Sequence, residues 1–179
     1  MKTGSEKAEN MTILGGKHLV AKTHPRIAFR GRIDILEAEM IEAQALAAQS
    51  GEEEFCACLG EILDYLRAMM AAEVKETPLA PPFLFGMDAE ELHRRSHNSE
   101  GGLPPLPSYT QGQLAARINL LRARVREAEL LAIRVFGPRD DTGEAEKAEH
   151  KEREDIILGL NRLSSALWWL FCEYNRRSL

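Results

Sequence analysis

The chain has 179 residues and a formal net charge of −5 at pH 7, with 44% hydrophobic and 28% charged residues. This length allows one domain with a sizeable core, and the acidic balance argues against nucleic-acid binding through general positive charge. No apolar run approaches the length of a membrane span, so we expect no contact with a membrane. The three cysteines form no C-x-x-C pair; they are Cys56, Cys58 and Cys172. Scattered thiols and the lack of a signal peptide indicate a reducing, cytoplasmic setting.

Residues 1–23 are polar and contain glycine, and we expect them to form an arm that is irregular or briefly extended. Residues 24–179 are expected to form a single helical domain. Pro25 suits the first turn of a helix, where its missing N–H costs little. Apolar residues spaced alternately four and three apart form one stripe, or seam, along a helix, and they predict one helix from Pro25 to about Gln49 and another after Ser50-Gly51. The seam of the first helix consists of Ile33, Leu36, Met40, Ala43 and Ala47. The seam of the second consists of Phe55, Leu59, Ile62, Leu66 and Met69.

A short helix lies between two loops rich in proline. The first loop, ETPLAPPFLFG over 76–86, cannot be a regular helix, and its phenylalanines either pack on the protein's own core or cover a flat hydrophobic ligand. Asp88 can cap the short helix that follows. His93 and His97 lie one turn apart on one face of it, a spacing that can bind a metal. Because no third ligand is evident in the sequence, two ordinary histidines are the alternative interpretation.

Residues 111–136 predict a long helix that carries an unusual density of arginine for an acidic protein. Arg122 and Arg126 are four residues apart, so they share one face beside the apolar seam. A guanidinium suits phosphate because its planar fork donates paired hydrogen bonds and stays charged. The alternative is a solvated charged face in which Glu127 and Glu129 are the partners. The seam consists of Leu114, Ile118, Leu121, Val125, Ala128, Ala132 and Val135.

The last helix is expected after Gly137-Pro138, with a cap among residues 140–142 and several polar turns before its apolar seam. Asn161 flanks that seam, where an amide usually makes a structural hydrogen bond. Trp168 and Trp169 are adjacent and cannot both face the same core, so one of them is expected to meet a neighbouring subunit. The seam consists of Ile156, Leu160, Leu163, Leu167, Leu170 and Tyr174.

Four long helices and one short helix predict an all-α five-helix bundle, and no strand pattern of any length is evident. Four segments of this chain, in the same order, resemble the ATP:corrinoid adenosyltransferases. The resemblance is closest to the ethanolamine-utilisation type and more distant to the propanediol-utilisation type, and it covers most of residues 11–175. The segments are LVAKTHPRIAFRGRIDILEA (19–38), DAEELHRRSH (88–97), LLRARVREAE (120–129) and LNRLSS (160–165).

The resemblance implies an enzyme that transfers the 5′-deoxyadenosyl group of ATP to cob(I)alamin, making adenosylcobalamin and releasing triphosphate. Its substrates would be ATP with Mg²⁺ and the corrinoid, and reduced cobalt would itself be the nucleophile, so no Ser, Cys or general base is required. It also implies a homo-oligomer, a trimer in preference to a dimer, that binds ATP at the subunit interface. The expected location is the cytoplasm, with association with a bacterial microcompartment left open.

The family's functional residues map onto particular positions of this chain. The resemblance implies that Lys22 contacts the ATP phosphates and that Arg126, the first arginine of the family's R-R-A-E-R signature, lies by the nucleotide. Asp34 would orient Arg126 through a salt bridge, and Asn161 of the L-N-R-L-S segment would also lie at the nucleotide. Arg122, one turn before Arg126, is taken with it as an ATP-binding residue.

The chain also departs from the family's pattern. Leu130 replaces the last arginine of R-R-A-E-R, and the family's phosphate-binding arm is not intact. The upstream His and Cys region that binds a metal in the ethanolamine type does not precede these residues, which implies a metal-independent member or a trimmed chain. For the apolar wall below the corrinoid, the loops supply Phe83, Phe85 and Tyr109 as candidates, with loop packing as the alternative. His93 and His97 remain the candidate ligands for a transition metal.

Two other functions are compatible with these residues. A bundle of this kind could hold ATP or corrinoid, or deliver adenosylcobalamin, without turnover, and Leu130 and the incomplete phosphate arm favour this alternative. A purely structural helical oligomer is the third hypothesis. It is disfavoured because packing alone does not require the identities of Lys22, Asp34, Arg126 and Asn161 together.

Overall fold

The computed structural model describes residues 8–16, 18–97, 106–138 and 152–177. Its first elements are two short antiparallel strands, β1 (Met11–Leu14) and β2 (His18–Ala21), with Met11 opposite Ala21. Gly15, which follows β1, has a φ of 59°, a value that glycine adopts without steric cost. The expectation that the chain has no strand was therefore wrong. Four-residue strands are too short to show a clear period of two, although the extended arm itself was predicted.

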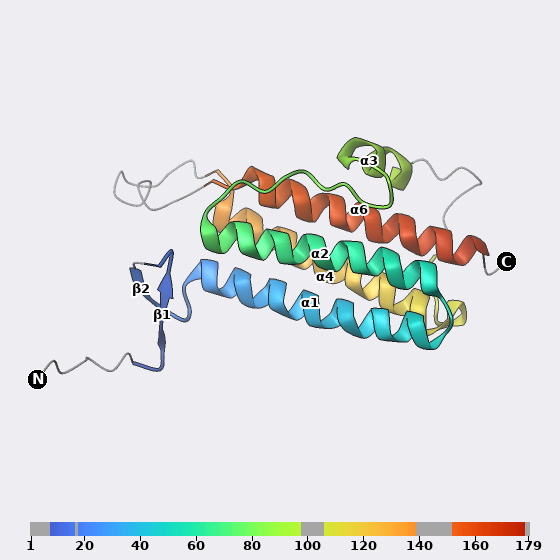
Figure 1. Ribbon diagram of the computed structural model, residues 1–179, viewed down its shortest axis with the longest axis horizontal. Coiled ribbons are helices and arrows are strands. Elements are labelled where there is room, and N and C mark those ends of the chain that lie inside the picture. The colour runs from blue at the N-terminus through green and yellow to red at the C-terminus, as the bar shows by residue number, and fades with distance from the viewer. Residues whose placement is uncertain (1–7, 17, 98–105, 139–151, 178–179) are drawn as a thin grey trace, which may run out of the picture.

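Four long helices and one short helix form the rest of the described structure, as the apolar seams predicted (Figure 1). A single 3₁₀ turn, η1, precedes the third long helix. The long helices are α1 (Pro25–Gln49), α2 (Glu53–Lys75), α4 (Gly112–Phe136) and α6 (Glu154–Arg177); the short helix is α3 (Ala89–His97), and η1 is Tyr109–Gln111.

Local hydrogen bonds explain where these helices begin and end. The Nδ1 atom of His24 caps α1 by accepting from the backbone N–H of Arg26 at 3.2 Å. Helix α2 stops after Lys75, because the next residue, Glu76, has a left-handed φ of 56° and its N–H turns back to carbonyl groups of the last turn. Asp88 caps α3 as predicted, because its Oδ1 accepts from the backbone N–H of Glu91 at 2.8 Å.

Helix α6 begins later than the sequence suggested. The expected cap among residues 140–142 lies outside the described residues, and the polar residues 152 and 153 are not helical. The backbone N–H of Arg153 donates instead to the carbonyl oxygen of Phe136 at the end of α4, at 3.2 Å. This bond joins the two helix ends and fixes the start of α6 at Glu154.

The long helices pack as a bundle in which α1 lies between α2 and α4, and α6 lies against α4 (Figure 1). Helices α2 and α4 run in the same direction. In the stretch of sequence that separates them, the chain therefore returns along the bundle, through the loop after α2 and through α3. Helix α3 packs on the outside of α6. The start of α1, the ends of α2 and α4 and the start of α6 therefore meet at one end of the bundle, and the hairpin lies beside this end.

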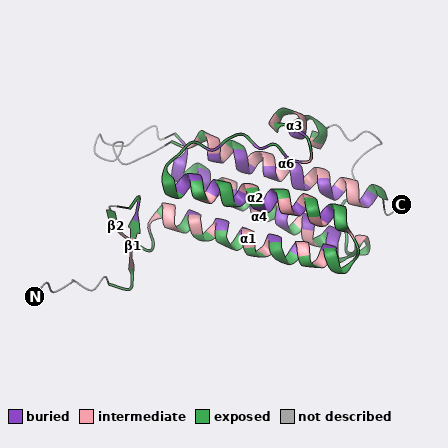
Figure 2. Cartoon of the chain, in the orientation of Figure 1, coloured by how far each residue is buried: buried purple, intermediate pink, exposed green. Residues whose placement is uncertain are grey.

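The core runs along the inside of all four long helices (Figure 2). Phe29 of α1 and Phe136 of α4 close one end of it, with ring centroids 5.0 Å apart in an edge-to-face contact. Gly159 allows α6 to approach α2, because a Cβ atom there would lie 2.9 Å from the hydroxyl oxygen of Tyr65. All three cysteines are free thiols. Within the described ranges, no helix combines the length and apolar character that crossing a membrane would require.

Candidate functional site

The arginine pair predicted on α4 lies on the outer side of the bundle. Arg122 is half-buried, with its guanidinium 5.1 Å above the ring of Trp168 and its Nε donating to Asn119 at 3.3 Å. Burial lowers the pKa of Arg122, and the positive charge of Arg126 lowers it further. Arg126 is exposed, and within the described residues no carboxylate forms an ion pair with either guanidinium. The pair can therefore accept an anionic ligand.

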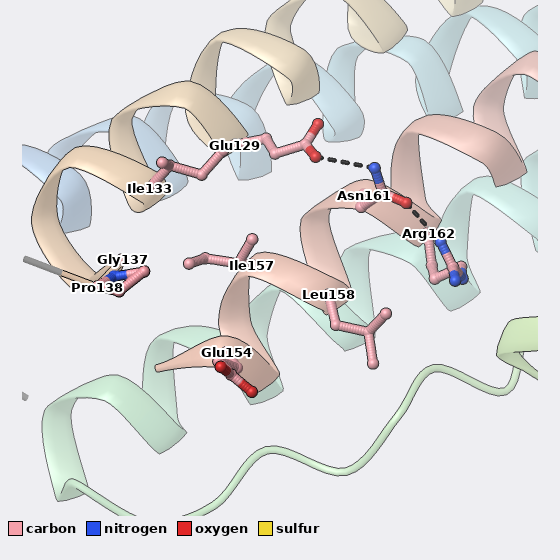
Figure 3. Close-up of a pocket in the computed structure, with 9 residues that line it drawn as sticks. All are labelled: Glu129, Ile133, Gly137, Pro138, Glu154, Ile157, Leu158, Asn161 and Arg162. Atoms are coloured by element: carbon pink, nitrogen blue, oxygen red, sulfur yellow. Dashed lines mark hydrogen bonds between the residues drawn. The ribbon is translucent and has the colours of Figure 1, made fainter. Parts of the chain in front are cut away.

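A hydrogen-bonded chain joins α4 to α6 one turn further along. The Nδ2 atom of Asn161 donates to Oε1 of Glu129 at 2.8 Å, and Arg162 donates to the Oδ1 atom of Asn161 (Figure 3). These contacts orient the amide, because the acceptor Glu129 holds its NH₂ group and the donor Arg162 holds its oxygen. The Nε atom of Arg162 is buried and lacks a hydrogen-bond partner among the described residues.

The hydrogen-bonded chain of Glu129, Asn161 and Arg162 forms one wall of an open hollow of about 490 Å³ between the end of α4 and the start of α6 (Figure 3). The hollow combines acceptor and donor atoms with apolar side chains, so it can take a small molecule that has both polar and apolar parts. Its lining consists of Glu129, Ile133, Gly137, Pro138, Glu154, Ile157, Leu158, Asn161 and Arg162.

The sequence interpretation missed the role of Glu129. It treated this carboxylate as a partner for nearby arginines, whereas Glu129 pairs with Asn161 and its neighbour Glu127 pairs with Arg32 and Arg124. A signal was present, because Glu129 occupies the glutamate position of the R-R-A-E-R signature that identified Arg126.

Asp34 and Arg126 lie at the same level of the antiparallel helices α1 and α4. Ion pairs on either side bracket them, one from Arg32 to Glu127 at 3.0 Å and one from Arg124 to Glu39 at 3.4 Å. Both side chains are nevertheless exposed, and within the described ranges no ion pair joins them. The expected contact between Asp34 and Arg126 is therefore not made within one chain.

Lys22 lies between the hairpin and α1. Its side chain is exposed, and its backbone N–H donates to the carbonyl oxygen of Asn10 at 2.8 Å. This position is at the end of the bundle where α4 ends and α6 begins, which is also the end that carries the hollow (Figure 1). Lys22 and Asn161 are thus brought to the same end of the molecule by different elements.

The three aromatic candidates have different surroundings. Phe85 stacks on Trp169 of α6, with ring centroids 5.4 Å apart, so the interpretation as loop packing holds for this residue. Phe83 is 69% exposed, although the loop around it is held by two hydrogen bonds at 2.7 Å, from the N–H of Phe85 to Glu61 and from the N–H of Leu79 to Asp155. Tyr109 is 90% exposed in η1, at the start of α4, and no described contact joins it to the loop.

The candidate metal ligands face one another on α3. The ring centroids of His93 and His97 are 4.3 Å apart, and Nδ1 of His97 forms a hydrogen bond with the carbonyl oxygen of His93 at 2.9 Å. His93 is exposed, but neighbouring atoms remove part of the water around its ring and so lower its pKa, and the positive charges of Arg162 and His97 lower it further. In the described part of the chain, no group of three or more His, Cys, Asp or Glu residues is arranged to hold a metal ion.

Comparison with known proteins gives three consistent results. A family model described as cobalamin adenosyltransferase matches residues 3–174. The corrinoid adenosyltransferase EutT of Salmonella typhimurium strain LT2 is 34% identical over 166 residues, and EutT of Escherichia coli K12 is 33% identical over 167 residues. These alignments cover 91% and 92% of this chain but 58% of each relative, so the chain spans less than two thirds of their length.

Solved structures show the same fold. A variant of the PduO-type ATP:corrinoid adenosyltransferase from Lactobacillus reuteri, complexed with cobalamin and ATP, has a TM-score of 0.63 at 20% identity. The match covers 94% of this chain and 90% of that one. A second variant of the PduO-type protein from that organism, complexed with ATP, has a TM-score of 0.61 at 20% identity. The predicted five-helix bundle is thereby confirmed.

Proposed function

Because the chain belongs to the cobalamin adenosyltransferase family, we propose that it transfers the 5′-deoxyadenosyl group of ATP to cob(I)alamin. The electron pair of Co(I) forms a bond to C5′ of ATP, and the bond between C5′ and the phosphate oxygen breaks. Triphosphate leaves with the electron pair of the broken C5′–O bond, and Mg²⁺ would complex it; the product is adenosylcobalamin. The cobalt is the nucleophile, so the protein's tasks are to align the reactants, stabilise the leaving group and exclude water.

The observation that carries this proposal is that the Glu129–Asn161–Arg162 chain lies next to Arg122 and Arg126 of α4, which form no ion pair within the described residues. The hollow offers apolar contact for an adenine ring and hydrogen-bonding groups for ribose hydroxyls. Arg122 and Arg126 then supply positive charge for the triphosphate, and a guanidinium is suited to this task because it donates paired hydrogen bonds to phosphate oxygens. Lys22 follows β2 and precedes α1, at the end of the bundle that carries the hollow, and would add a third cation.

We assign the contact between Asp34 and Arg126 to two different subunits. The two side chains are exposed and lie at one level without meeting in a single chain. Exposed apolar residues on the same two helices, such as Ile35 at 48% and Leu130 at 58%, would favour association. The proposal is a cytoplasmic homo-oligomer, a trimer in preference to a dimer, with ATP bound where the subunits meet; a link to a microcompartment is a further prediction.

Phe83 and Tyr109 are the proposed contacts for the corrinoid, because both present exposed aromatic faces. Phe85 is better described as support for the loop, since its ring is stacked on Trp169. A transition metal at His93 and His97 stays a prediction, and it would require a third ligand from a partner subunit or from substrate.

An alternative function is a module that binds ATP or corrinoid, or delivers adenosylcobalamin, without turnover. The observation that favours it is Leu130, which is exposed on α4 one turn after Arg126, where the family's signature has another arginine. One fewer cation would weaken the stabilisation of the departing triphosphate.

Substitution of Arg126 distinguishes these two functions. Arg134 is the matched control, because it is also an exposed arginine of α4. With chemically reduced cob(I)alamin, we expect Arg126→Ala to lower kcat/KM for ATP about 100-fold, as the loss of one group that stabilises transition-state charge does. Arg134→Ala should leave kcat/KM within about threefold of the unaltered protein. An inactive wild-type protein that still binds both substrates would favour the alternative, and unfolding of Arg126→Ala alone would remove the support for this site.

A further inference from the structure

Glu73 is fully buried, although it is a carboxylate in the last turn of α2. Both features are unfavourable on their own. Removing a carboxylate from water is strongly unfavourable unless a cationic partner compensates for the lost hydration. The carbonyl end of a helix dipole also disfavours negative charge. A residue of this kind at this position needs strong compensation from elsewhere in the fold.

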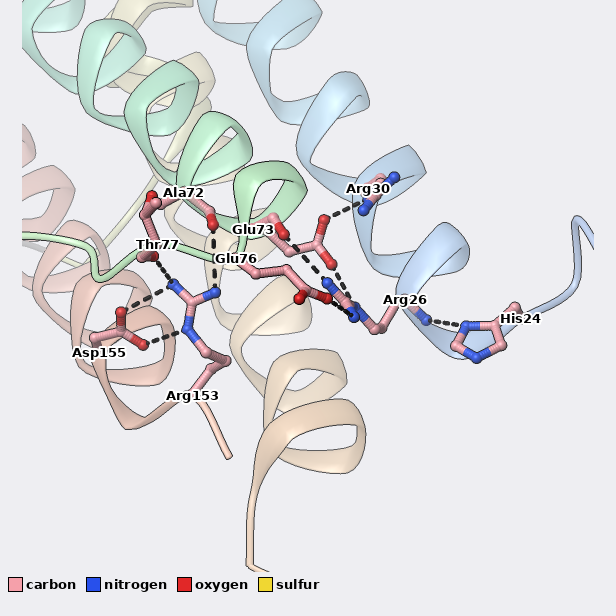
Figure 4. A network of polar contacts seen from close by, with 9 residues as sticks. All are labelled: His24, Arg26, Arg30, Ala72, Glu73, Glu76, Thr77, Arg153 and Asp155. Carbon is pink, nitrogen blue, oxygen red and sulfur yellow. Dashed lines mark hydrogen bonds and ion pairs between the residues drawn. The ribbon is translucent and has the colours of Figure 1, made fainter. Parts of the chain in front are cut away.

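Among the residues that the structure describes, the compensating cations come from the first two turns of α1 (Figure 4). Arg26 donates through Nε to Oε1 of Glu73 at 2.6 Å, and through Nη2 to its backbone carbonyl oxygen at 3.2 Å. Arg30, one turn later, donates through Nε to the other carboxylate oxygen. Arg26 also donates through Nη1 to Oε1 of Glu76 at 2.8 Å. Glu73 therefore locks the start of α1 to the end of α2.

The hairpin and Lys22 are attached to the bundle at this point. The hairpin stands outside the bundle beside the start of α1, so its placement depends on the junction more than on a shared core (Figure 1). At the junction His24 caps α1 and the N–H of Lys22 bonds to Asn10. On the other side, Glu76 lies close to the hairpin turn, since a Cβ atom on Gly15 would be 3.5 Å from its Oε1.

We propose that Glu73 is a positioning residue for the phosphate end of the ATP site. Through Arg26 and Arg30 it fixes the start of α1, and through this junction it places the hairpin and the ammonium group of Lys22. The inference rests on the function proposed above, because it assigns Lys22 to the triphosphate. It adds a residue that does not touch the substrate and that no motif of the sequence marks.

The test is Glu73→Gln, which keeps the shape of the side chain and removes its charge. The matched control is Glu54→Gln, at the other end of α2, which breaks the ion pair of Glu54 with Arg177 of α6. We expect Glu73→Gln to raise KM for ATP about tenfold while kcat changes by less than about twofold. Backbone hydrogen exchange should become faster in the hairpin and the first turn of α1 and stay unchanged in α4.

A second variant covers the case in which Glu73→Gln does not fold. Glu76→Gln weakens the partly exposed contact with Arg26 and leaves Glu73 unaltered, so it should give a smaller change in the same two measurements. Unchanged exchange in the hairpin would overturn the proposal, and so would faster exchange in every helix or an equal change in Glu54→Gln. Because hydrogen exchange needs no turnover, a wild-type protein that makes no adenosylcobalamin would overturn the proposed function while the exchange data still decide the role of Glu73.

Discussion

Replacing Asn161 by alanine tests the hydrogen-bonded chain between α4 and α6. The variant loses the 2.8 Å bond to Glu129 and the acceptor that Arg162 uses, while the Nε atom of Arg162 already lacks a partner in the described part of the chain. A hydrogen bond to a charged group contributes about 1.5–3 kcal/mol. Because Asn161 is half-buried, we expect the lower end, about 1.5 kcal/mol of unfolding free energy, which corresponds to a fall of about 3–6 °C in Tm for a chain of this size.

The effect on function should be much larger than the effect on stability. If Asn161 orients the nucleoside, its removal should lower kcat/KM for ATP about 100-fold. The assay combines urea unfolding with anaerobic turnover, and Glu129→Gln serves as the control that keeps an acceptor for the amide. A loss of more than about 3 kcal/mol of unfolding free energy without a change in ATP binding would show that Asn161 is structural. Turnover within about threefold of wild type would show that Asn161 does not orient the nucleoside.

Three further variants test other parts of the structure. Gly159→Ala brings a methyl group against Tyr65, so it should lower the unfolding free energy by about 1–2 kcal/mol, and a neutral result by urea unfolding would show that α2 and α6 can separate at no cost. Burial raises the pKa of Asp155, but hydrogen bonds from Arg153 and backbone N–H groups outweigh it, so the pKa lies below its usual value. The contribution of Asp155 to stability is therefore complete above the unfolded pKa of about 3.9 and is lost as pH falls through the folded pKa. The difference in Tm between wild type and Asp155→Asn should accordingly shrink in that acidic range and stay constant near pH 7. His93→Ala with and without a strong chelator tests the metal prediction: if a metal is bound there, chelator and substitution should lower turnover equally, and activity that resists both would exclude a required metal at this site.

The fold could be predicted because its determinants are local. The four-and-three spacing that begins at Ile33 and recurs in each long helix fixes which face is buried, and Asp88 marks the start of α3 as a cap. The hairpin could not be predicted in this way, because its four-residue strands are defined by their pairing rather than by a periodic pattern. The start of α6 was misplaced because a tertiary hydrogen bond from Arg153 to Phe136 decides it.

The candidate site was only partly accessible from the sequence. Arg126 and Asn161 were identified by motif, and the structure brings Asn161 to a hollow. Glu73 could not be found, because it is one acidic residue among many until the fold buries it against two arginines. The separation of Asp34 from Arg126 also needed the structure, since helix spacing alone does not tell whether two residues on different helices meet within a subunit or between subunits.

Anaerobic incubation of this chain with ATP, Mg²⁺ and chemically reduced cob(I)alamin tests most directly whether the chain itself performs the transfer. Absorbance follows the conversion of the Co(I) form to adenosylcobalamin, and chromatography counts one triphosphate for each corrinoid converted. We predict conversion that requires ATP and that falls in Arg126→Ala but not in Arg134→Ala. The absence of conversion, in a folded protein that still binds ATP and corrinoid, would contradict the account and identify the chain as a binding module.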